Sequence, residues 1–173
     1  MHRSGASFLA AALCQSGVVF SPQSGQSSEI DNPQLIALNE AVLADSGGSW
    51  DQPPERLEWS GVRLASAREL AERFAGKRIW GLKDPRLLLT LEGWQQVLPT
   101  VQRVGVFRHP QAVARSLHKH GGIRDPEQAL RLWFVYNQRL LAEFRRDPFP
   151  VLCFDQQPEP PDQRVRKLAR ELG

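Results

Sequence analysis

The chain has 173 residues, of which 41% are hydrophobic and 24% are charged, and its net charge is +3 at pH 7. This composition excludes a disordered chain, collagen and a coiled coil, and the length predicts a single domain over residues 1–173. No apolar run approaches the roughly 20 residues that cross a bilayer, and the N-terminus lacks a secretory signal pattern. We therefore expect a cytoplasmic protein without a membrane span, and its slight basic excess allows an anionic ligand.

The first half of the chain predicts three helices. Residues 8–16 are strong helix formers, and Gly17 stands where a glycine ends a helix. Apolar residues recur at helical spacing from Asn32 to Gly47, and again from Leu64 to Phe74. Turn-forming residues separate these helices.

The second half alternates strands and helices. Strands are expected over residues 78–82, 101–107 and 150–154. Helices are expected from Leu88 to Leu98, over 111–120, from Asp125 to Arg146 and over 162–172. This alternation predicts an α/β fold with a mainly parallel sheet and flanking helices.

The helix from Asp125 to Arg146 is the longest of these. Asp125 followed by Pro126 is typical of a helix start, with an N-cap carboxylate and a proline at the first helical position. We expect seven of its residues to be buried: Leu130, Trp133, Phe134, Asn137, Leu140, Leu141 and Phe144.

Three basic turns follow or precede these elements, at residues 2–7, 83–86 and 108–110. Ligands of open α/β sheets bind at the carboxyl ends of strands, so converging basic turns predict a site for a polyanion. In the first turn, Gly5 allows close backbone approach, Ser4 and Ser7 offer hydroxyls, and the next helix offers free N–H groups. A plain turn that leads into a helix fits the same residues. The turn lacks the Gly-Lys-Ser/Thr ending of a nucleotide triphosphatase, which argues against a kinase or ATPase.

Residues 2–7 read H-R-S-G-A-S, which resembles the H-R-S-G-T-S loop of sulfotransferases that use 3'-phosphoadenosine 5'-phosphosulfate (PAPS). The resemblance continues through residues 80–86, through Arg108-His109-Pro110 with Ser116 eight residues after the arginine, and through Trp133 and Tyr136. It implies a three-layer architecture like that of P-loop NTPases. It also implies transfer of a sulfuryl group from PAPS to a hydroxyl or amine, without a metal.

The resemblance also implies which residues bind PAPS. Arg108 and Ser116 would hold its 3'-phosphate, because a strand-end arginine can bond a phosphate bidentately and a helical serine can add a hydroxyl. The alternative is a surface arginine and a small helix residue. The 5'-phosphosulfate would be bound by Arg3, Ser4, Gly5, Ala6 and Ser7.

Lys83 and Arg86 would line the same cofactor and transfer site. Sulfuryl transfer needs cationic donors where charge builds on the leaving phosphate oxygens, and Lys83 is the expected donor. Arg86 would be a phosphate clamp or a salt-bridge partner. The alternative for both is an ion network with Asp84.

The general base would be an acidic side chain before the second helix. Asp31 and Glu29 are the candidates, although either could cap that helix instead. His109 is an alternative base.

Two departures from the sulfotransferase pattern stand out. Ala6 replaces the threonine of the loop, and Met1 stands where relatives carry an apolar first strand, so that strand is expected to be missing. They favour an alternative function: a catalytically impaired member that binds a nucleotide or a protein. The acceptor could be a small molecule, a carbohydrate or a peptide. No nucleic acid is expected, because no aromatic residues interleave the basic residues near the C-terminus.

Overall fold

The computed structural model describes residues 1–22, 30–120, 122–155, 163, 165, 167 and 168. By its internal contacts the chain divides into two compact units. Unit 1 consists of Met1–Ala12 and Gln102–Gly173, and unit 2 consists of Leu13–Val101. The single domain expected from the length stays a prediction.

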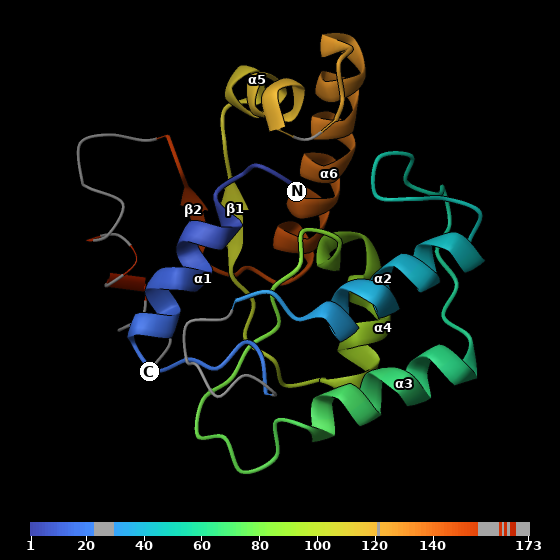
Figure 1. Ribbon diagram of the computed structural model, residues 1–173, viewed down its shortest axis with the longest axis vertical. Helices are drawn as coiled ribbons and strands as arrows, with labels where there is room; N and C mark the ends of the chain where they lie inside the picture. Colours follow the sequence, from blue (N-terminus) through green and yellow to red (C-terminus); the bar gives the residue numbers. More distant parts are fainter. Residues whose placement is uncertain (23–29, 121, 156–162, 164, 166, 169–173) are drawn as a thin grey trace. The chain divides into compact units, whose positions relative to one another are not determined.

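Unit 2 contains three of the predicted helices, α2 (Pro33–Asp45), α3 (Gly61–Glu72) and α4 (Leu87–Val97), which pack on one another (Figure 1). The start of α2 is set locally, because the Asn32 side chain accepts hydrogen bonds from the backbone N–H groups of Gln34 and Leu35. Their shared core is formed by Leu35, Leu38, Val42, Ala67, Leu70 and Trp94.

The strand expected over residues 78–82 of unit 2 is not formed. Trp80 makes a single parallel bridge with Val19, through hydrogen bonds from Val19 N to the Ile79 oxygen and from Gly81 N to the Val19 oxygen. One bridge does not extend into a ladder. The strand prediction was therefore wrong, although the segment is held by its Trp80 ring, which stacks on Phe74 with centroids 4.5 Å apart.

Unit 1 contains the sheet. Its elements are β1 (Gly105–Phe107), α5 (Pro110–His120), α6 (Pro126–Arg146) and β2 (Val151–Cys153), and α1 (Ala6–Gln15) begins in it (Figure 1). The strands β1 and β2 are parallel, with Gly105 opposite Val151. The helices α5 and α6 connect them and pack against each other.

The strand expected over 101–107 is shorter than predicted. It begins only at Gly105, because Val101 N bonds to the Leu98 oxygen and so continues the turn that ends α4. The helix expected over 162–172 lies largely outside the described residues; residues 163, 165, 167 and 168 are helical. Among the described residues the fold is thus a mixed helical one with a two-stranded parallel sheet, and a larger layered sheet is not seen there.

The start of α6 is confirmed, since the Asp125 side chain accepts from Glu127 N and Pro126 opens the helix. Its buried face was predicted wrongly. The residues with exposed fractions of 3% or less are Ala129, Leu132 and Tyr136.

Four residues of α6 that were expected inside are exposed: Leu130, Phe134, Leu141 and Phe144. The other three, Trp133, Asn137 and Leu140, are half-buried. The apolar stripe of α6 is therefore wider than the face that its neighbour α5 covers. No helix in the described part of the chain is both long and apolar enough to cross a membrane.

Candidate anion-binding site

Three distant segments of unit 1 meet at the first turn of the chain. Nε of Arg3 donates a hydrogen bond to Oγ of Ser116 at 2.8 Å, and Nη1 of Arg108 donates to the backbone oxygen of Arg3 at 3.2 Å. Arg108 directly follows β1 and Ser116 lies on the next helix, α5, so both come after the carboxyl end of that strand. Unit 1 thus brings together three of the residues expected to bind PAPS. We call Arg3, Arg108 and Ser116 the arginine cluster.

The backbone of the turn is bent by left-handed residues. Arg3 has φ +63° and Gly5 has φ +98°, and Gly5 accepts the hydrogen bond from Leu9 N that opens α1. Ser4 is buried, whereas Ser7 is exposed in the first turn of α1. The first N–H groups of α1 have no partner within the helix, as at every helix N-terminus, and Ala6 begins this turn without a hydroxyl.

Asp155 completes the surroundings of Arg108. Its Oδ1 accepts from Arg108 Nε at 3.1 Å, and its Oδ2 accepts from His109 N at 2.7 Å. The guanidinium carbon also lies 5.1 Å from the ring centroid of Phe154. The sequence assigned no role to Asp155. Its place just after β2 was the available signal, because the carboxyl ends of paired parallel strands meet at one edge.

Trp133 of α6 fixes the backbone at the same point. Its indole Nε1 donates to the backbone oxygen of Arg108 at 2.9 Å, and its ring meets that of Phe107 edge to face. Arg108 is therefore held through its backbone as well as through its side chain.

The arginine cluster contains two guanidinium groups, and among the described residues the one carboxylate paired with it is that of Asp155, which pairs with Arg108. In the part of the chain that the structure describes, the two terminal nitrogens of Arg3 and Nη2 of Arg108 donate no hydrogen bond. Arg3 is exposed, and 26% of the Arg108 side chain is exposed. Guanidinium groups beside a hydroxyl form a donor set that suits phosphate or sulfate oxygens.

Unit 2 brings together two residues that were expected to be catalytic. Nζ of Lys83 lies 2.7 Å from Oδ1 of Asp31, and the Lys83 side chain is 10% exposed while that of Asp31 is 63% exposed. Asp31 does not cap α2, because Asn32 does so. Glu29, the other candidate base, lies outside the described residues.

Arg86 of unit 2 takes part in an ion network. Its Nη1 lies 3.0 Å from Oδ1 of Asp84, and its Nη2 lies 2.6 Å from Oε1 of Glu40. Asp84 also accepts from Asn39 Nδ2 at 2.9 Å. Both terminal nitrogens of Arg86 are therefore engaged, which favours the salt-bridge role over the phosphate clamp.

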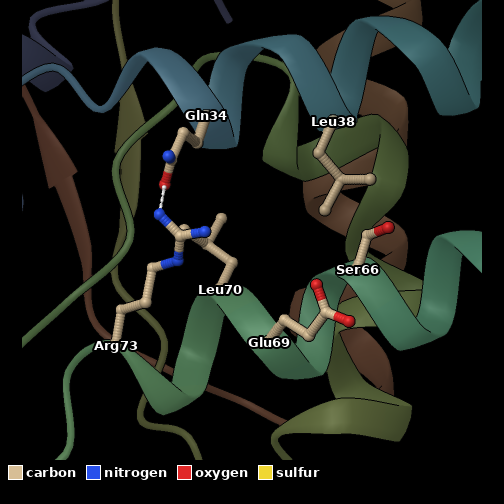
Figure 2. A pocket seen from close by; sticks show the side chains of 6 residues that line it. All are labelled: Gln34, Leu38, Ser66, Glu69, Leu70 and Arg73. Carbon is tan, nitrogen blue, oxygen red and sulfur yellow. Dashed lines mark hydrogen bonds between the residues drawn. The ribbon is translucent and has the colours of Figure 1, made fainter.

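A shallow pocket lies elsewhere in unit 2, between α2 and α3 (Figure 2). A hydrogen bond of 2.8 Å from Arg73 to Gln34 crosses it, as Figure 2 shows. None of its lining residues is a predicted site residue; they are Gln34, Leu38, Ser66, Glu69, Leu70 and Arg73. Among the described residues, no three His, Cys, Asp or Glu side chains gather as metal ligands.

Comparisons with models of protein families, with curated proteins and with solved structures find no match to this chain.

Proposed function

We propose that the chain is a sulfotransferase that moves the sulfuryl group of PAPS to the hydroxyl or amine of a small-molecule, carbohydrate or peptide acceptor. The observation that carries this proposal is the arginine cluster, where Arg3, Arg108 and Ser116 meet from three segments of unit 1. The sequence motifs that resemble those of PAPS-dependent enzymes occur at these same residues. The three-layer, mainly parallel sheet of that family is part of the proposal.

The arginine cluster suits the phosphates of PAPS. The proposed role of Arg108 and Ser116 is to bind the 3'-phosphate. The turn that holds Ser4, Gly5, Ala6 and Ser7 would bind the 5'-phosphosulfate through the first N–H groups of α1 and the Arg3 guanidinium. Asp155 would keep the Arg108 side chain oriented toward the phosphate. One of its carboxylate oxygens accepts a hydrogen bond from the Arg108 side chain, and the other accepts from the backbone N–H of His109.

Lys83 and Asp31 are the proposed catalytic residues. PAPS, when bound, supplies a sulfur atom that is already activated by its bond to phosphate. The acceptor oxygen or nitrogen forms a bond to that sulfur while the bond to the bridging oxygen breaks, and adenosine 3',5'-bisphosphate leaves. Asp31 is proposed to take the acceptor's proton, since its carboxylate is largely exposed, and Lys83 to donate to the leaving oxygen.

The binding step is tested by thermal unfolding with adenosine 3',5'-bisphosphate. At a ligand concentration 100 times Kd, we expect Tm to rise by about 5–10 °C. Arg108→Ala should abolish the rise. Arg115→Ala, which removes an exposed arginine of α5 next to Ser116, should keep it. A Tm that the nucleotide leaves unchanged in the wild-type chain would contradict the proposal.

The catalytic step is tested separately, with radiolabelled PAPS and a panel of acceptors. We expect transfer by the wild-type chain and a transfer rate at least 100-fold lower in Lys83→Ala.

The alternative function, a nucleotide- or protein-binding module, is favoured by Ala6, which offers no hydroxyl at the first position of α1. Nucleotide binding without transfer to any acceptor would support that alternative.

A further inference from the structure

An exposed apolar stripe on α6 is a surface feature of unit 1 that the fold does not explain. Its four apolar side chains have exposed fractions of 40%, 54%, 46% and 38% and lie at positions 130, 134, 141 and 144: Leu130, Phe134, Leu141 and Phe144. Large apolar residues that gather along one line on a surface are typical of an interaction site, whereas scattered ones are ordinary. The proposed function makes no use of this stripe.

The spacing along the stripe is that of a helix–helix seam. Counting Asn137, the residues follow one another at intervals of four, three, four and three, which is the repeat of a coiled coil. A straight helix keeps such residues on one side for about 21 Å, from Leu130 to Phe144. A second helix is therefore the partner whose shape fits the stripe.

The charges beside the stripe favour an antiparallel partner of the same sequence. Glu127 lies in the first turn of α6, three residues before Leu130, and Arg145 lies in the last turn, four residues after Leu141. Both therefore border the stripe. In a parallel pair of α6 helices Glu127 and Arg145 would stay at opposite ends of the seam, whereas in an antiparallel pair Glu127 lies near Arg145 of the other copy. Glu127 now pairs with Arg131 of its own helix, and Arg145 makes no ion pair among the described residues.

The order of side chains is also compatible with a twofold axis. The stripe reads Leu130, Phe134, Asn137, Leu141, Phe144, and an axis near Asn137 would place each leucine opposite a phenylalanine of the other copy. A polar residue in the middle of such a seam fixes the register of the pair.

Contacts within unit 1 also hold both ends of α6. Asp125 caps its start, and Arg103 pairs with Glu143 at 3.3 Å and with Asp147 at its end. The stripe is thus presented by a helix whose two ends are fixed within unit 1.

We propose that two copies of the chain associate through an antiparallel pair of α6 helices, with Leu130, Phe134, Leu141 and Phe144 at the contact. One helix pair buries less than the roughly 800 Å² per partner of a standard interface. The expected dimer is therefore weak, with a Kd in the micromolar range, of order 10–100 µM.

Sedimentation equilibrium of the full chain, from about 1 to 500 µM, tests this proposal. We expect a monomer–dimer equilibrium in the wild-type chain. Phe134→Glu should weaken it at least tenfold and leave the circular dichroism spectrum unchanged, because half of that side chain is already exposed. Val62→Glu, at an exposed valine of α3, is the matched control and should leave the equilibrium unchanged.

A charge exchange tests the orientation of the two helices. Glu127→Arg should weaken the dimer through repulsion from Arg145, and adding Arg145→Glu to the same chain should restore it. A chain that stays monomeric up to the highest concentration overturns the proposal. So does a dimer that Phe134→Glu leaves intact, and a double variant that fails to recover overturns the antiparallel arrangement.

Discussion

A β-carbon at Gly5 would lie 2.8 Å from Cε2 of the Phe154 ring and closer still to Cδ2. The turn at the start of the chain and the residue after β2 therefore meet in a space that admits no side chain. The backbone of Gly5 is also left-handed, with φ +98°. The close approach of Phe154 and the left-handed backbone would each destabilise a larger residue at position 5, and substitutions can separate the two effects.

We expect Gly5→Ala to lower the free energy of unfolding by about 2–4 kcal/mol, of which roughly 1 kcal/mol reflects the left-handed backbone and the rest reflects overpacking against Phe154. Urea unfolding measures the change. Gly17→Ala is the matched control, because Gly17 has φ +94° and, among the described residues, no atom beyond its chain neighbours lies within 4 Å of its added β-carbon. Equal losses in the two variants would show that the Phe154 contact contributes nothing.

Asn39 holds the polar interior of unit 2 together. Its Nδ2 donates to Asp84, and its Oδ1 accepts from Thr90 Oγ1 and from Trp94 Nε1, each at 2.9 Å. Asn39→Ala leaves these buried groups without their partner, so we expect a loss of about 2–4 kcal/mol in the free energy of unfolding. Gln34→Ala, which removes an exposed amide from the same helix, should cost less than about 0.5 kcal/mol. Similar losses of unfolding free energy in the two variants would contradict a stabilising role for the hydrogen bonds of Asn39.

Removing the cap of α2 should lower the free energy of unfolding by less than the loss of the Asn39 network does. Asn32→Ala removes the acceptor for Gln34 N and Leu35 N, and we expect it to cost about 1 kcal/mol in thermal unfolding. Asn32→Asp keeps an acceptor oxygen and should retain most of that stability. If Asn32→Asp loses as much stability as Asn32→Ala, the hydrogen bonds of the cap do not cause the loss.

The ion pair between α2 and α3 has a defined pH dependence. A hydrogen bond from Arg63, at 2.7 Å, holds the pKa of Asp45 below its usual value. The unfolded chain therefore binds this proton more readily, so the pair stabilises the fold above about pH 4 and loses that effect as the pH falls through the native pKa. An NMR titration of the Asp45 carboxyl should show the lowered pKa, and Arg63→Gln should return it to the usual value. An unchanged titration curve in that variant would contradict the assignment.

The sequence predicts those features that depend on residues close to one another along the chain. The starts of α2 and α6 were predicted at Asn32-Pro33 and Asp125-Pro126, and both positions are confirmed. The capping residue itself was predicted only for α6, since Asp31 and Glu29 were the cap candidates for α2. The segment 78–82 has the composition of a strand, but a strand also requires a neighbour, and within the described part of the chain this segment pairs with a single residue, Val19. No local pattern contains that information.

The same limit applies to side-chain partners. Helical periodicity indicates that α6 has an apolar side, but the packing of α5 decides which part of it is buried. Asp155 and Glu40 lie far along the chain from Arg108 and Arg86, so their ion pairs could not be predicted from spacing. Arg3, Arg108 and Ser116 were singled out by motif, and their mutual contacts join the first turn to the end of β1 and to α5, which no local spacing predicts.

Unit 1 is assembled from the first twelve residues and from the chain after Val101. During synthesis Arg3 therefore leaves the ribosome long before Arg108, Ser116 and Phe154 exist. At the usual speed of translation this interval is roughly 5–30 seconds, far longer than a helix or a small unit needs to fold. Unit 2 is complete once Val101 is made, roughly 3–10 seconds before Phe154, so unit 2 can form while the turn at Gly5 still lacks the residue that encloses it. A nascent chain stalled before β2 should thus contain a folded unit 2 and an unformed arginine cluster.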